Sequence, residues 1–167
     1  VLDGLTTLTL VRLRRIEGLR CLLHDMAEIG WTRIAAWKLA FQFLAAANFA
    51  HTLLQQRCDH LHVHFAHTPA QIAMYASALS GIPFTITAHA NDIFERGLLL
   101  PQKAERAIRL LTISEHNRDY LEKLGIPSNQ LGIVRCGVSF TANTAPEKNA
   151  GKTRFRIGTL GRMVEKK

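Results

Sequence analysis

The chain has 167 residues, of which 47% are hydrophobic and 20% are charged, a balance typical of a globular protein and not of a disordered one. Its formal net charge of +8 favours an anionic partner, such as nucleic acid, an acidic membrane surface or a phosphorylated substrate. The aromatic residues do not alternate with basic residues, which argues against a nucleic-acid platform, and three widely separated cysteines argue against a disulfide framework or a zinc knuckle.

The amino-terminal third of the chain favours two long helices. Several arginines lie on the first helix, which runs toward Glu28, and Gly30 separates it from a second helix at residues 31–56. Apolar residues near helical spacing predict a face of the second helix that packs in the core: Ile34, Trp37, Phe41, Leu44 and Ala45. Polar residues interrupt this helix too often for it to span a membrane.

From residue 59 onward, short apolar strands alternate with helices. Strands are predicted at residues 61–65, 83–87, 110–113 and 131–135, and helices at residues 69–80, 101–109 and 114–125. Thr68 is the predicted N-cap of the helix at 69–80, which has Pro69 in its first turn and Gly81 after its end. The alternation predicts parallel βαβ units, and therefore an α/β fold with a Rossmann-like parallel sheet and flanking helices.

The carboxy-terminal residues indicate the start of a second unit. Residues 1–138 are expected to form one domain, and residues 139–154 have the composition of a linker. Residues 155–167 begin with an apolar run and a glycine, followed by Arg162 and Lys167. Such a pair can grip a diphosphate, and solvated surface charge is the alternative. The chain is therefore expected to be a fragment that lacks most of a second domain.

Polar clusters follow the predicted strands at the carboxyl edge, where open parallel sheets bind ligands. The clusters are His62, His64 and His67; His89, Asn91 and Asp92; Ser114, Glu115 and His116; and, near the end of the chain, Arg162 and Lys167. Their shared placement predicts that they contribute to one site.

The first cluster has two interpretations. His62 and His64 point the same way from a strand, and His67 could complete a metal site, a spacing similar to that of metallo-β-lactamase-like hydrolases. However, Ala66 stands where those proteins carry aspartate. In the alternative interpretation, the histidines pack or form hydrogen bonds at the edge of the strand.

The other two clusters also have alternatives. His89, followed by Asp92, can bind sugar hydroxyls or donate to a phosphate, while Asn91 and Asp92 can also cap a short helix through residues 93–94. Ser114 is the predicted N-cap of the helix that follows it, and the same helix terminus would attract an anion. The surrounding residues lack the Gly-x-Ser-x-Gly motif, which excludes a serine-hydrolase elbow.

Several segments together resemble a known enzyme family. They are residues 60–66 (HLHVHFA), 81–94 (GIPFTITAHANDIF), 112–117 (TISEHN), 135–138 (RCGV) and 161–167 (GRMVEKK). In this order they resemble the family 4 glycosyltransferases, retaining enzymes with two Rossmann-like domains (the GT-B architecture), particularly those of exopolysaccharide and colanic-acid pathways. The resemblance implies that the chain covers the amino-terminal half of that architecture and the start of the second half. The glycine-rich loop that usually follows the first strand of this family is not evident, so the amino terminus is expected to be truncated.

The resemblance also implies roles for individual residues. Arg162 and Lys167 would stabilise the diphosphate of a nucleotide-sugar donor as it leaves, and His89 would lie beside the transferred sugar. The residues expected on the acceptor and sugar side are His64, Asn91, Asp92 and Ser114. No metal or other cofactor is expected, because the nucleotide-sugar is a substrate and side chains neutralise its diphosphate.

The expected function is transfer of a hexose to a glycan or lipid-linked glycan in cell-surface polysaccharide synthesis. The expected location is the cytoplasm, with peripheral contact at the inner face of the plasma membrane, and no nucleic-acid partner is expected. The basic residues at 12–20, Arg33 and Lys38 either contact anionic lipid or form a solvated face. Two other functions stay open, a metal-dependent hydrolase using His62, His64 and His67 and a non-catalytic Rossmann-like binding module. The fragment alone is predicted to be inactive.

Overall fold

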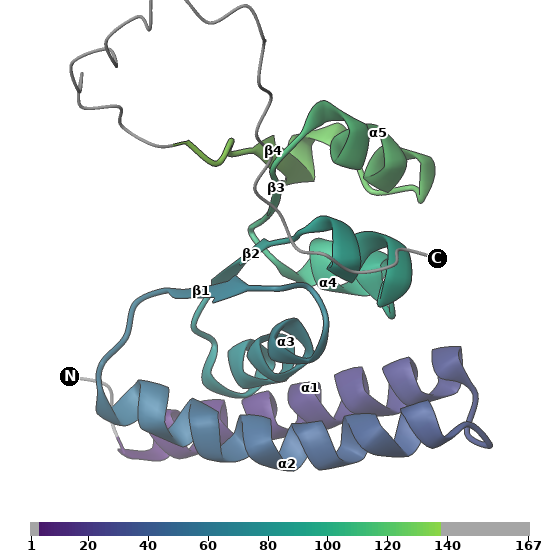
Figure 1. Ribbon diagram of the computed structural model, residues 1–167. Coiled ribbons are helices and arrows are strands. Elements are labelled where there is room, and N and C mark those ends of the chain that lie inside the picture. The colour runs from purple at the N-terminus through teal and green to yellow at the C-terminus, as the bar shows by residue number, and fades with distance from the viewer. Residues whose placement is uncertain (1–3, 138–167) are drawn as a thin grey trace, which may run out of the picture. The chain divides into compact units, whose positions relative to one another are not determined.

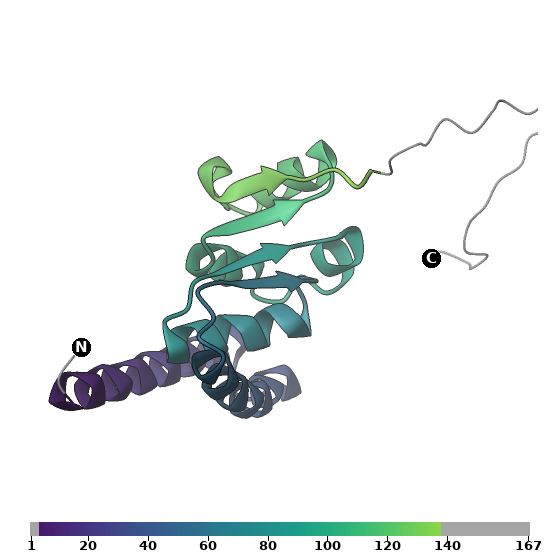
Figure 2. The ribbon, with the colours of Figure 1, turned by 90° about the vertical axis from the view of Figure 1, so that its left-hand side faces the viewer.

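A four-stranded parallel sheet forms the centre of the fold (Figures 1 and 2). The computed structural model describes the backbone of residues 4–137 and the side chains from residue 14 onward. The strands are β1 (Leu61–His64), β2 (Phe84–Thr87), β3 (Arg109–Thr112) and β4 (Leu131–Ile133), in the spatial order β1-β2-β3-β4. In Figure 2 the four arrows point in the same direction, and every neighbouring pair is parallel. The predicted Rossmann-like α/β fold is confirmed.

Helices connect the strands and cover the sheet. The crossovers contain α3 (Thr68–Ser80), a short π-helix (Asn91–Glu95) with α4 (Leu100–Arg106), and α5 (Glu115–Lys123) followed by a 3₁₀ turn (Ser128–Gln130). Before the sheet, α1 (Gly4–Ile29) and α2 (Ile34–Gln55) lie side by side, and α3 lies between this pair and β1 (Figure 1). In the part of the chain that the structure describes, no helix is both long and apolar enough to cross a bilayer.

The ends of α3 show how local chemistry sets its length. The predicted N-cap, Thr68, is wrong by one residue, because Nδ1 of His67 accepts a hydrogen bond of 2.8 Å from the backbone N–H of Thr68. An imidazole nitrogen therefore does what a serine or threonine hydroxyl usually does at this position. At the other end, Gly81 adopts a left-handed conformation with φ of 74°, as its predicted role requires.

The outward face of α2 differs from the prediction. Ala36, Leu39, Ala46, Ala50 and Leu53 are buried, whereas the predicted core residues Ile34, Trp37, Phe41 and Leu44 are 77%, 61%, 75% and 64% exposed, and Ala45 is also exposed. The physical reason is the spacing between helices. Ala36, Ala46 and Ala50 let α2 approach α3 and α1 closely, so this face is the buried one, with Leu39 and Leu53 as its larger residues, and the aromatic residues lie on the opposite face.

A buried carboxylate ties the helical layer to the rest of the domain. Asp25 of α1 is fully buried and accepts two hydrogen bonds of 2.7 Å from the guanidinium of Arg106 in α4, and one of 2.9 Å from the hydroxyl of Tyr75 in α3. Burial and the Asp25 charge raise the pKa of Tyr75, so its hydroxyl stays protonated as a donor. Burial would lower the pKa of Arg106, but its hydrogen bonds to Asp25 raise it.

The predicted linker at 139–154 and the predicted second unit at 155–167, with Arg162 and Lys167, lie outside the described residues.

Replacing Asp25 with asparagine tests the importance of this connection. We expect Asp25→Asn to lower the free energy of unfolding by about 3 kcal/mol, because it leaves the Arg106 charge without its counterion in a largely buried position. Urea denaturation measures the change. The matched control is Asp119→Asn, whose side chain is 58% exposed and which should change stability by less than about 0.5 kcal/mol. Equal effects of the two substitutions on the free energy of unfolding would contradict the stabilising role of the Asp25–Arg106 contact.

Candidate functional site

Two imidazole rings meet at the carboxyl edge of the sheet. His64 is the last residue of β1, and His89 follows β2, so the parallel pairing of these strands brings them to the same edge. Their ring centroids are 6.4 Å apart with an interplanar angle of 16°. The structure therefore brings together two of the residues that the sequence predicted for one site.

Phe65 adds an aromatic face to this pair. It has a φ of 74°, which is uncommon for a residue other than glycine, and it is 48% exposed. Its backbone N–H donates to the carbonyl of Thr87 at 2.9 Å, and its ring centroid lies 5.3 Å from that of His89 and 5.6 Å from that of His67. Strained backbone of this kind persists only where the surrounding structure holds it, and it is common at functional sites.

Asp92 lies beneath the site and fixes its two turns. Its carboxylate is 1% exposed, and Oδ2 accepts hydrogen bonds from the backbone N–H of Ala66 at 3.0 Å and of His89 at 3.1 Å. One buried oxygen therefore joins the turn after β1 to the turn after β2. Asp92 therefore positions the backbone of His89, and its predicted contact with an acceptor stays a prediction.

Lys103 holds the same turn from the other side. Its side chain is fully buried, and its ammonium group donates to the carbonyl of Ala66 at 2.5 Å and to that of Leu98 at 2.7 Å. Burial lowers the pKa of Lys103 to about 7, while the charge of Asp92 acts in the opposite direction. No signal in the sequence distinguishes Lys103, because a lysine in a short helix is normally solvated.

The histidines of the predicted metal cluster have other partners. Nδ1 of His62 is 2.7 Å from the hydroxyl of Thr85, and Nε2 is 3.1 Å from that of Thr87. In His67, Nδ1 accepts from the backbone of Thr68, which places the proton on Nε2, 3.7 Å from a carboxylate oxygen of Asp92. Burial, together with the neighbouring His64, lowers the pKa of His62, which favours its neutral form.

No metal site is assembled from these side chains. Over residues 4–137, no three His, Cys, Asp or Glu side chains are arranged to hold a metal ion. The metal-dependent hydrolase that used His62, His64 and His67 therefore gains no support, and the interpretation as packed, hydrogen-bonded histidines describes them better.

The other predicted residues have local roles. The Ser114 hydroxyl accepts from the backbone N–H of Asn117 at 3.3 Å and caps α5, as predicted. The side chain of Asn117 does not complete a capping box and donates instead to the hydroxyl of Thr112 at 3.0 Å. Asn91 is exposed and donates to Glu95 at 2.6 Å within the π-helix. Arg162 and Lys167 lie outside the described residues.

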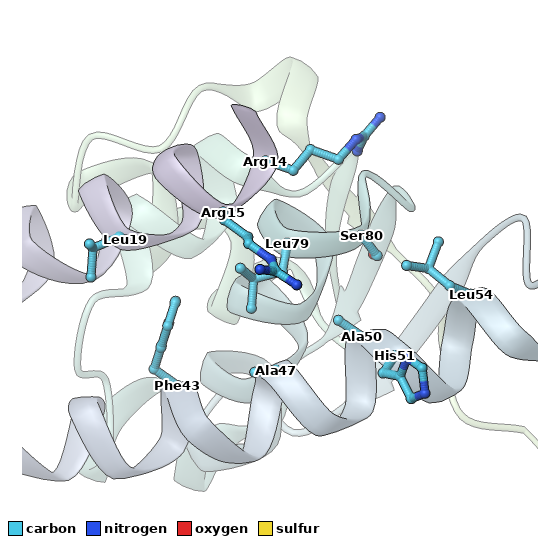
Figure 3. Close-up of a pocket in the computed structure, with 10 residues that line it drawn as sticks. All are labelled: Arg14, Arg15, Leu19, Phe43, Ala47, Ala50, His51, Leu54, Leu79 and Ser80. Atoms are coloured by element: carbon cyan, nitrogen blue, oxygen red, sulfur yellow. The ribbon is translucent and has the colours of Figure 1, made fainter. Parts of the chain in front are cut away.

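A cavity between the helices lies away from this edge of the sheet. Figure 3 shows a cavity of about 660 Å³ between α1, α2 and the carboxyl end of α3, where Leu79 and Ser80 precede β2. It therefore lies near the amino-terminal edge of the sheet, and its size alone does not make it the reaction site. The convergence of His64, Phe65 and His89 identifies the opposite edge as the candidate site.

A comparison with protein-family models identifies the family of the chain. The family model described as Glycosyltransferase Family 4 matches residues 23–141, which is more than half of the chain and includes every described site residue. No curated protein matches the chain.

The pH dependence of stability tests the environment of Lys103. The unfolded chain keeps this group protonated up to its ordinary pKa of 10.5, whereas the folded protein releases the proton near pH 7. The unfolded state therefore binds more protons between these values, so this group makes the free energy of unfolding rise with pH, by up to about 1.4 kcal/mol per unit. We expect Lys103→Met to remove this contribution, as measured by urea unfolding between pH 7 and 9.

A direct titration keeps this prediction testable even if the variant does not fold. The ¹³Cε resonance of Lys103 in the unsubstituted protein should titrate well below the other lysines, and titration near pH 10.5 would contradict the assignment.

Proposed function

The chain belongs to glycosyltransferase family 4, and on that premise we propose that it binds the acceptor in the retaining transfer of a hexose from a nucleotide-sugar. The observation that carries the proposal is the His64–His89 pair, which lies beside Phe65 at the carboxyl edge of a parallel sheet. This is the edge at which such sheets bind ligands.

The chemistry of the edge suits a sugar. The imidazoles of His64 and His89 can donate or accept hydrogen bonds with sugar hydroxyls, and the half-exposed ring of Phe65 offers an apolar face. We assign His89 to the transferred sugar and His64, Asn91 and Ser114 to the sugar and acceptor side. Asp92 supports His89 through its backbone N–H.

The donor diphosphate needs positive charge as its bond to the sugar breaks. We assign this role to Arg162 and Lys167, because a planar guanidinium can bind phosphate oxygens in pairs and a nearby ammonium adds a point charge. With these groups the reaction requires no metal ion or further cofactor. We further propose that the acceptor is a lipid-linked glycan of cell-surface polysaccharide synthesis, reached from the cytoplasmic face of the membrane.

A histidine substitution tests the assignment of the sugar site. We expect His89→Ala to lower kcat for transfer from a nucleotide-sugar by about 10²-fold, the usual effect of removing one hydrogen-bond donor from a polar transition state. The measurement is made on the full gene product with a panel of nucleotide-sugars. His51→Ala, which removes an exposed imidazole from α2, is the control and should retain activity. Unchanged kcat in His89→Ala would refute the role of this residue.

Substitutions near the carboxyl end test the donor site. We expect Arg162→Gln and Lys167→Gln each to lower kcat/KM for the nucleotide-sugar by about 10²–10³-fold, because each removes a cation from the leaving diphosphate. Lys166→Gln removes the same charge one residue away and serves as the control. If all three variants lose activity equally, general attraction by the basic segment explains the effect and the specific assignment fails.

A further inference from the structure

The outer face of α2 is apolar and unpartnered in the part of the chain that the structure describes. We name the α2 stripe as Trp31, Ile34, Trp37, Phe41 and Leu44, which are between 47% and 77% exposed. The four residues within α2 recur at helical spacing on the side opposite its buried residues, and Trp31 lies in the turn before the helix, where its carbonyl accepts a hydrogen bond from the indole of Trp37. Exposed apolar surface of this kind marks an interaction site more often than a solvated face.

Every charged residue in the segment that carries the stripe is basic. Residues 29–58 contain no aspartate or glutamate, and Arg33 and Lys38 are exposed beside the stripe. Tryptophan, phenylalanine and leucine on one helix face, with basic side chains at its border, are typical of helices that lie in a membrane interface. In a two-fold pair of stripes, the basic residues of one copy would lie close to those of the other, which disfavours self-association.

A basic cavity adjoins the stripe on the side of the candidate site. Its volume is about 240 Å³, and Lys38, Gln42, His67, Gln71 and Arg96 line it with four other residues. Lys38 lines the cavity and also borders the α2 stripe. It lies one helical turn from Ile34 and Phe41 of the stripe, and one turn from Gln42, which lines the cavity. Among the described ion pairs, none involves Lys38 or Arg96, so both cations are available to a ligand.

Two further features of the cavity indicate which ligand it can bind. Oε1 of Gln42 is buried and has no hydrogen-bond partner within the described residues, so it can accept from a ligand hydroxyl. His67 connects the cavity to the candidate site, because its ring lies beside that of Phe65, which lies beside His89. A ligand in this cavity therefore lies next to the sugar-binding edge.

We propose that the α2 stripe enters the interface of an anionic bilayer and that the adjoining cavity binds the phosphate group of a lipid in that bilayer. The stripe contacts the acyl region, while Lys38 and Arg96 bind the phosphate and Gln42 accepts from a hydroxyl of the headgroup. The inference rests on the proposed function in one respect, that this lipid carries the acceptor glycan. Binding to the membrane itself requires no donor and no transfer.

Vesicle sedimentation tests the stripe and the cavity separately. The protein should sediment with vesicles that contain phosphatidylglycerol and much less with vesicles of phosphatidylcholine alone. Trp37→Ser with Phe41→Ser should lower the partition coefficient at least about tenfold, since two large apolar side chains leave the interface. Lys38→Gln with Arg96→Gln should lower binding to the anionic vesicles about tenfold or more and abolish the preference for them.

Matched controls make equal changes elsewhere on the surface. Ile108→Ser with Val134→Ser removes two side chains that are 58% and 55% exposed, and Arg109→Gln with Lys123→Gln removes two exposed cations. Both pairs should retain vesicle binding. Absence of binding to anionic vesicles would overturn the inference, and so would equal losses in the control variants. A dimer seen by analytical ultracentrifugation would also overturn it if Trp37→Ser with Phe41→Ser dissociates that dimer.

Vesicle binding and sugar transfer test separate proposals. Normal vesicle binding without transfer from any nucleotide-sugar would reject the proposed function alone. Transfer to soluble glycans without vesicle binding would reject this inference and the lipid-linked acceptor, but not transfer from a nucleotide-sugar.

Discussion

Ala66 is held by two buried charges of opposite sign, and the candidate site depends on this arrangement. Its backbone N–H donates to the carboxylate of Asp92, and its carbonyl accepts from the ammonium group of Lys103. Buried charges are costly unless each is satisfied, so a pair devoted to backbone groups indicates a conformation that must be kept. That conformation includes the left-handed Phe65 immediately before Ala66.

The same arrangement explains why the site forms across two strands. Asp92 also accepts from the backbone N–H of His89, so the turns after β1 and β2 share one anchor. His64 and His89 then face each other without any direct hydrogen bond between them. Within the part of the chain that the structure describes, their ring nitrogens have no hydrogen-bond partner, whereas those of His62 are engaged by two threonine hydroxyls. Neighbouring histidines in the same strand therefore have different chemical roles.

Much of the fold was predictable because its signals are local. Alternating apolar residues predicted the strands, Gly81 predicted the end of α3, and Ser114 predicted the cap of α5. The placement of His64 and His89 at one edge followed from parallel pairing alone. What failed depended on tertiary contacts. Helical spacing located the apolar stripe of α2 but not the direction it faces, because the small residues Ala46 and Ala50 decide the packing. The burial of Lys103 and Asp25 likewise depends on partners that are distant in sequence.

The two tryptophans of the chain, Trp31 and Trp37, both lie on the outer side of the helical layer, far from the buried centre of the domain. The indole N–H of Trp37 donates to the carbonyl of Trp31 at 3.0 Å, so the two belong to one local environment. Intrinsic fluorescence of this protein consequently reports on solvent or lipid around a surface helix. Because Tyr75 is fully buried, its near-ultraviolet signal is the more direct optical record of the tertiary core.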